Sequence, residues 1–285
     1  MRVPQQLQPL MDEGLIDEVV LQLKSGKEAQ VYAVRCGDAL RCAKIFKETR
    51  KRSFKQASTY QEGRRGRNSR RERAMSKKSR YGRREQEDAW QNAEVEALYR
   101  LSEAGVRVPT PHGFVDGVLL MEMIDDGEGG VAPRLGDVVP DEAEALEWHA
   151  RIVADVARML CAGLIHGDLS EFNVLIGRDG PVIIDLPQAV NAAGNNSARR
   201  MLLRDVENMR RCLGRYAPSL LQTDYGLELW SLFETGELYP DYPLTGRFDR
   251  DNASVDVGEL LAVIEDVRQE EQARRARLSD EDETP

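Results

Sequence analysis

The chain has few aromatic residues and no long apolar run. Phe, Trp and Tyr make up only 6% of its 285 residues, whereas Asp, Glu, Lys and Arg make up 31%. Since no stretch of about 18 or more apolar residues occurs, the sequence predicts no membrane-spanning helix. The first residues, Met-Arg-Val-Pro-Gln-Gln, lack the apolar core of a secretion signal. These absences favour a globular protein of the cytoplasm.

Cysteine is also scarce, and internal repeats are absent. The four cysteines have no metal-ligand spacing, which excludes a zinc-ribbon or similar site; they are Cys36, Cys42, Cys161 and Cys212. In a cytoplasmic protein such cysteines are expected to be reduced, buried thiols. The chain is long enough to bury a full core, as one two-lobed domain or two small ones.

The net charge of −9 conceals a strong asymmetry along the chain. Residues 50–84 carry 15 Lys or Arg against two acidic residues, inside an otherwise acidic protein. This segment has almost no aliphatic residues, so we expect it to be mobile without a ligand. Its charge could bind nucleic-acid phosphates, with Phe54, Tyr60 and Tyr81 stacking on bases. The alternative is a solvated loop that attracts acidic regions of the same protein.

The most informative segment lies between residues 165 and 188. Val174–Ile176 and Val182–Ile184 are short β-branched runs joined by Gly-Arg-Asp-Gly, which predicts a hairpin. Asn173 and Asp185 are symmetric about the turn, so antiparallel pairing would place them opposite each other. An amide oxygen and a carboxylate are ligands for a Mg²⁺ ion that also carries phosphate. Asp168 lies in the loop just before and can point to the same place.

The N-terminal part predicts strands around a phosphate-binding turn. Leu15–Leu23, Ala29–Arg35 and Arg41–Phe46 have strand patterns, and Ser25, Gly26 and Lys27 lie at the first turn. A helix is expected from about Glu85 to Ala104, ending at Gly105. Glu94 falls within the apolar stripe of this helix and needs a cationic partner, for which Lys44 on the third strand is the natural candidate.

A further strand, Val118–Ile124, leads into a polar, glycine-rich linker that marks a hinge. We expect adenine to bind there through backbone groups of Glu122 and Ile124, with Met121 as a wall. A helix capped by Asp141 follows, with one face formed by Leu146, His149, Val153, Val156 and Leu160. Helices are also expected at 198–213, 219–234 and 255–278. The predicted division is 1–124, 125–245 and 246–285.

Five segments resemble the RIO family of atypical serine/threonine protein kinases, in particular its shorter bacterial members. They are Ser-Gly-Lys-Glu-Ala-Gln-Val-Tyr at 25–32, Ala-Lys at 43–44, the stretch 90–94, His-Gly-Asp-Leu-Ser-Glu-Phe-Asn at 166–173 and Ile-Asp-Leu-Pro-Gln at 184–188. The resemblance implies an α+β, two-lobed protein-kinase-like fold. Its N-lobe is an antiparallel sheet with a helix. Its C-lobe is mostly helical and lacks the activation segment and peptide-binding helices.

The resemblance also implies roles for individual residues. Ser25, Gly26 and Lys27 would contact phosphates, and Lys44 would hold the α- and β-phosphates while pairing with Glu94. Asp168 would be the catalytic aspartate. Asn173 and Asp185 would bind Mg²⁺, or Mn²⁺ in its place. The family's counterpart of Asp185 is also thought to accept phosphate during ATP hydrolysis.

Three functions remain open from the sequence. The first is a RIO-type kinase or ATPase that acts on a protein or on itself, with acceptor residues Ser53, Ser58, Thr59, Ser69, Ser76 or Ser79. The second is a small-molecule phosphotransferase of the aminoglycoside or choline type, because these enzymes share the His-Gly-Asp, Asn and Asp pattern. The third is an assembly factor that binds RNA or a ribosomal particle through residues 50–84 and uses ATP as a switch.

Overall fold

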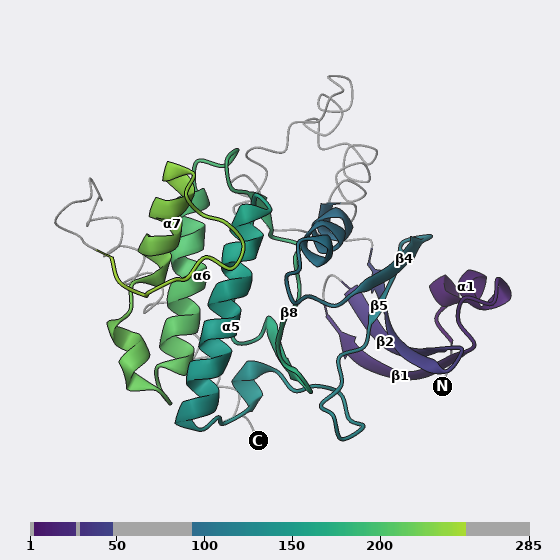
Figure 1. Cartoon of the computed structure of the whole chain (residues 1–285). Coiled ribbons are helices and arrows are strands. Elements are labelled where there is room, and N and C mark those ends of the chain that lie inside the picture. Colours follow the sequence, from purple (N-terminus) through teal and green to yellow (C-terminus); the bar gives the residue numbers. More distant parts are fainter. Residues whose placement is uncertain (1–2, 27–28, 48–92, 249–285) are drawn as a thin grey trace, which may run out of the picture. The chain divides into compact units, whose positions relative to one another are not determined.

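A computed structural model of the chain describes residues 3–26, 29–47 and 93–248 (Figure 1). They fall into two compact units, one formed by the residues up to Pro133 with Leu175–Ala189, the other by Arg134–Val174 with the residues from Val190 on. These bounds differ from the expected division. The basic segment 50–84 and the expected helix at 255–278 lie outside the described residues.

The first unit contains a five-stranded antiparallel sheet in the order β1-β2-β3-β5-β4. Its strands are β1 (Glu18–Ser25), β2 (Ala29–Cys36), β3 (Ala39–Phe46), β4 (Pro111–Val115) and β5 (Val118–Glu122). Four of them match the predicted strands. The sequence did not predict β4, because its Pro-His-Gly start has low strand propensity.

Alternation along the strands gives the sheet two different faces. Ala43 and Ile45 point into a core that also contains Leu7 and Leu10, all of them almost fully buried. These leucines come from the short helices η1 (Gln5–Leu7) and α1 (Gln8–Asp12), which pack beside the sheet (Figure 1). Lys44 therefore points to the opposite face. Residues 93–103 form a helix that ends at Gly105, whose φ of +75° is the expected left-handed terminus.

The predicted hairpin is present as β7 (Val174–Gly177) and β8 (Gly180–Ile183). Three backbone hydrogen bonds join it to the first unit. Ile176 N–H donates to the Pro133 carbonyl (2.8 Å), Arg178 N–H to the Asp125 carbonyl (2.9 Å), and Ile183 N–H to the Arg107 carbonyl (2.9 Å). These bonds explain why residues 175–189 group with the sheet rather than with the helices.

The second unit is mainly helical. Helices α5 (Glu142–Cys161), α6 (Ala198–Leu213) and α7 (Tyr225–Thr235) pack against one another. Its described part also contains two 3-10 helices, η2 (Leu135–Asp137) and η3 (Pro218–Gln222), and the paired strands β6 (Leu164–Ile165) and β9 (Val190–Asn191). The helix expected at 219–234 is therefore divided into η3 and α7. The predicted α+β class, with an antiparallel sheet in one unit and mainly helices in the other, is confirmed.

Helix α5 begins where the sequence predicts. The Asp141 carboxylate accepts from the Glu144 N–H (2.8 Å), and the Glu144 carboxylate accepts from the Asp141 N–H (3.0 Å), which forms a capping box. His149 is a core residue, 1% exposed, as predicted. Leu146 was wrongly placed on the buried face: it is 39% exposed, because the buried stripe runs instead through Ala145 and Ile152.

Two further expectations concern the whole of the described chain. All four cysteines are free thiols; Cys42 and Cys212 are buried, whereas Cys36 and Cys161 are only half-buried, which corrects the expectation for those two. Within residues 3–26, 29–47 and 93–248, no helix has the length and apolarity needed to cross a membrane.

Candidate active site

Lys44 lies at the centre of a buried ion-pair cluster in the first unit. Its Nζ forms an ion pair with the Glu94 carboxylate and lies 3.3 Å from Asp185 Oδ1. The Lys44 and Glu94 side chains are only 12% and 10% exposed. Nζ also lies 5.5 Å from the centre of the Phe46 ring. The predicted Lys44–Glu94 pair is thus present, and Asp185 joins it.

The electrostatics of this cluster keep the lysine charged. Burial by itself would lower the pKa of Lys44, but the negative charges of Glu94 and Asp185 and their hydrogen bonds raise it above its ordinary value. Lys44 therefore stays protonated, and its ammonium is a donor that can bind a phosphate oxygen of a nucleotide.

Asp185 follows β8 in an unusual backbone conformation. Its φ is +69°, in the left-handed region that non-glycine residues rarely adopt. Aspartate is among the few residues that tolerate this region, and such strain is concentrated at functional sites. The local backbone therefore turns at the residue whose carboxylate reaches Lys44.

A second lysine, Lys47, directly follows β3 and contacts the turn after β1; the sequence analysis did not identify it. Lys47 Nζ donates to the Gly26 carbonyl (2.7 Å) and lies 3.4 Å from Ser25 Oγ. The pairing of β2 with β3 could have indicated it, because Ala29 lies opposite Phe46 and places the next residue beside this turn. Ser25 and Gly26 lie at the end of β1 and in the turn that follows it, as predicted. Lys27 lies outside the described residues.

The segment after β5 contains a backbone donor that is not used within the described part of the chain. The Glu122 N–H donates to the Thr110 carbonyl (2.8 Å), and the Ile124 carbonyl accepts from the Ala132 N–H (3.1 Å). These two backbone groups of the expected adenine site are therefore already bonded within the protein. In the described part of the chain, the N–H of the buried Ile124 has no hydrogen-bond partner, so it is the group suited to a base. Met121, just before, is partly exposed.

In the second unit, helix α6 fixes the loop around Asp168. The Asp205 carboxylate, 1% exposed, accepts from the N–H groups of Gly167 (2.7 Å) and Leu169 (2.9 Å), one on each side of Asp168. Two more α6 side chains hold the carbonyls: Arg204 donates to Gly167 O (2.6 Å) and Asn208 to Leu169 O (2.8 Å).

The α6 contacts to this loop were not predicted, since Asp205 lies in the middle of a helix with no local signal. Burial raises the pKa of the Asp205 carboxyl to about 7, although the two N–H groups and Arg204 act in the opposite direction.

His166 and Asn173 also support the loop. His166 is 2% exposed, and its Nδ1 accepts from the Asp168 N–H (3.3 Å), so the expected hydrogen-bonding role of His166 is present. Asn173 Nδ2 donates to the Asp168 carbonyl (2.8 Å), which leaves the amide oxygen as the end available to a cation. Oxygen donors of this kind fit Mg²⁺. Lys44, Glu94 and Asp185 belong to one unit and Asp168 and Asn173 to the other.

An antiparallel sheet with a β3 lysine paired to a helix carboxylate is the arrangement of protein-kinase-like proteins. The comparisons with known proteins identify the family within this class. The model of the RIO domain matches residues 30–225, well over half of the chain. The chain belongs to the RIO domain family.

Several relatives carry the same family name. The RIO-type serine/threonine-protein kinase Rio1 of Haloferax volcanii is 35% identical over 70% of this chain and 64% of its own length. The protein of the same name from Methanocaldococcus jannaschii is 32% identical, over 68% of this chain and 62% of its own length. Human serine/threonine-protein kinase RIO1 is 30% identical over 74% of this chain and 36% of its own length. The chain thus matches less than two thirds of each relative.

Proposed function

We propose that the chain catalyses ATP- and Mg²⁺-dependent phosphoryl transfer, as a RIO-type serine/threonine kinase or ATPase that also phosphorylates itself. The observation that carries this proposal is the buried cluster of Lys44 with Glu94 and Asp185. Family membership supports it, as do relatives named serine/threonine-protein kinases. Those names favour a protein kinase over a small-molecule phosphotransferase.

The phosphates would be bound by cations and the turn after β1. Lys44 would contact the α- and β-phosphates, and its charge would offset the negative charge that grows as the γ-phosphoryl group leaves. Ser25 and Gly26 would approach the phosphates through their backbone. Lys27 and Lys47 would add positive charge at the same turn.

The base and the metal ion would bind at other positions. Ile124 N–H and the Glu122 carbonyl would hold adenine, beside Met121. Asn173 and Asp185 would hold Mg²⁺, or Mn²⁺ in its place, because both present oxygen donors. When bound, such an ion neutralises charge on the phosphate oxygens.

Asp168 would be the catalytic aspartate. Its carboxylate would position a serine or threonine hydroxyl, or a water, and accept its proton. Hydrogen bonds from the flanking N–H groups to Asp205 support this role, because they hold the loop in one conformation. The acceptor hydroxyl could come from the chain's own segment 50–84.

The partner of the basic segment is a further part of the proposal. Residues 50–84 carry 15 Lys or Arg against two acidic residues, which supports binding of RNA or a ribosomal particle in the cytoplasm. Salt-dependent RNA binding that disappears when this segment is deleted would support it.

The test of the catalytic proposal uses two substitutions and a matched control. Asp168→Ala should keep Mg²⁺-dependent ATP binding but lower phosphate release and autophosphorylation by about 10²- to 10⁴-fold. Asp185→Asn should lose the Mg²⁺ dependence of ATP binding; asparagine, like aspartate, tolerates a positive φ.

Asp116→Asn is the control, since Asp116 also has a positive φ (48°) but lies in the exposed turn after β4. Calorimetry and phosphate release measure these effects. Unchanged turnover in Asp168→Ala or Asp185→Asn would contradict the assignments.

A further inference from the structure

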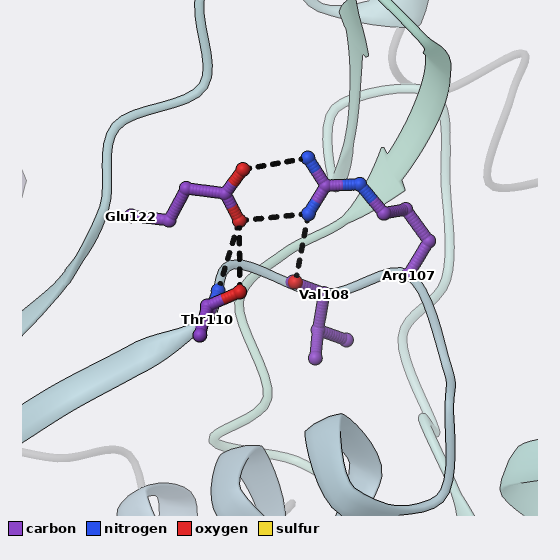
Figure 2. Close-up of polar contacts among 4 residues, drawn as sticks. All are labelled: Arg107, Val108, Thr110 and Glu122. Atoms are coloured by element: carbon purple, nitrogen blue, oxygen red, sulfur yellow. Dashed lines mark hydrogen bonds and ion pairs between the residues drawn. The ribbon is translucent and has the colours of Figure 1, made fainter.

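Arg107 forms a side-chain ion pair with Glu122, the last residue of β5 (Figure 2). Its Nη1 and Nη2 donate to Oε2 and Oε1 of Glu122, both at 2.8 Å, in a bidentate pair. The same carboxylate accepts from the Thr110 N–H (3.0 Å) and hydroxyl (3.2 Å). Arg107 Nη1 also donates to the Val108 carbonyl (3.1 Å). Four donors therefore fix one carboxylate.

The charges of this pair are maintained although both side chains are about two-thirds covered, at 37% and 31% exposure. Burial would raise the pKa of Glu122, but the hydrogen bonds from Arg107 and Thr110 together with the Arg107 charge lower it below its ordinary value. The carboxylate remains ionised at neutral pH. A planar guanidinium makes two parallel bonds here, which a lysine ammonium cannot reproduce.

The position of Arg107 in the chain gives the pair its significance. Glu122 is the last residue of β5, two residues before the unpaired Ile124 N–H. The Arg107 carbonyl accepts from the Ile183 N–H (2.9 Å), on β8 and two residues before Asp185. Through its side chain and its main chain, one residue is thus bonded to two strands that belong to different sheets.

We propose that Arg107 is a positioning residue. It fixes the backbone at the end of β5, where a nucleotide base would bind, relative to the end of β8, which is followed by the proposed metal ligand Asp185. The inference rests on the proposed function, since it assigns the base to Glu122 and Ile124. Arg107 acts through Glu122 and Ile183. Loss of its side chain should therefore affect recognition of the base more than recognition of the phosphates.

The experiment compares ATP with tripolyphosphate, which lacks the base and the sugar. Arg107→Lys keeps the positive charge but loses the planar, bidentate guanidinium. It should weaken ATP binding about tenfold while leaving tripolyphosphate binding unchanged. The KM for ATP in autophosphorylation should rise with little change in kcat. Arg35→Lys is the matched control: Arg35 makes a single, exposed contact with Glu18 (3.4 Å) in the same sheet and should change neither affinity.

A second substitution keeps the inference testable should Arg107→Lys fold poorly. Glu122→Gln keeps the shape of the side chain and removes its charge, so it should show the same selective loss of ATP affinity. Unchanged ATP affinity in these variants would overturn the inference, and so would equal weakening of ATP and tripolyphosphate, which indicates a general structural effect. Failure of the proposed function would be visible separately, because the unsubstituted chain would then bind no Mg²⁺-ATP.

Discussion

His149 and Asp205 are buried ionisable residues whose pKa values shift in opposite directions. Burial, with the nearby Arg210 charge, lowers the pKa of His149 to about 4, and its Nε2 has no hydrogen-bond partner among the described residues. Burial raises the pKa of Asp205 to about 7. Both residues are therefore close to neutral in the folded protein at mildly acidic pH. Ionisation of either one lowers the folding stability, that of His149 as pH falls and that of Asp205 as pH rises.

The His149 shift predicts acid destabilisation. Between pH 6.5 and about 4 the unfolded chain binds a proton at His149 that the folded protein does not, so folding stability falls as pH decreases through this window. Relative to His149→Phe, which does not titrate, the unsubstituted protein should lose on the order of 3 kcal/mol between pH 7.5 and 4.5. Urea unfolding at the two pH values measures the difference. Parallel pH profiles for the two proteins would contradict it.

Asp205 supplies an internal control of opposite sign. Its folded-state carboxyl holds a proton between the ordinary value of 3.8 and about 7, so its contribution to stability decreases as pH rises through that range. An Asp205→Asn variant should therefore change the pH profile in the direction opposite to His149→Phe.

At the scale of elements, the hairpin β7–β8 is packed against the segment that follows β5. A Cβ added at Gly177 would lie 2.7 Å from the Ile124 Cγ2 and 3.4 Å from the Asp125 carbonyl. Glycine is therefore required where β7 approaches the buried Ile124. The bond from the Arg178 N–H to Asp125 follows immediately.

This contact predicts the effect of a single methyl group. Gly177→Ala should lower the free energy of unfolding by about 1–3 kcal/mol through overpacking and raise the KM for ATP, because Ile124 moves. Adding Ile124→Leu, which removes the Cγ2 methyl, should restore part of the loss. Gly113→Ala in β4 is the control, since its Cβ would meet nothing within 4 Å. Equal stability of the Gly177 and Gly113 variants would show that the contact relaxes without cost.

The elements also show how far local sequence patterns can predict this fold. Alternation and turn residues predicted β1, β2, β3, β5 and the hairpin, and Asp141 predicted the start of α5. Those signals are local. The edge strand β4 was missed because its residues are only partly buried and begin with proline. Leu146 was misplaced because a helical stripe computed from sequence can be shifted by one position without any change in its period.

At the scale of the whole molecule, the sequence predicted the charged side chains of the candidate site that pair with one another. It did not predict the residues that only hold the backbone around the site. The need of a core-facing Glu94 for a cation predicted its pairing with Lys44 across 50 positions. Asp185 lies 141 positions from Lys44. Arg107, Lys47 and Asp205 have no such signal, because their importance depends on which backbone groups the fold brings within hydrogen-bond distance.

The charge distribution of the whole chain gives a prediction of its own. Deletion of residues 50–84 removes a net positive charge from a protein whose remainder is acidic. It should abolish binding to a structured RNA and remove its steep dependence on salt. It should leave Mg²⁺-ATP affinity unchanged. Gel-shift titrations at two salt concentrations measure the first effect and calorimetry the second. RNA affinity retained by the deletion variant would exclude this segment as the binding element.

The three α6 side chains that hold the loop around Asp168 tie the motion of that loop to a helix. The amide protons of Gly167 and Leu169 are donated to a carboxylate that is 1% exposed. Their exchange with solvent therefore requires α6 to open as well, so loop and helix form one cooperative unit. A substitution that frays α6 far from Asp168 would thereby loosen the loop around Asp168, even where every residue of the loop is unchanged.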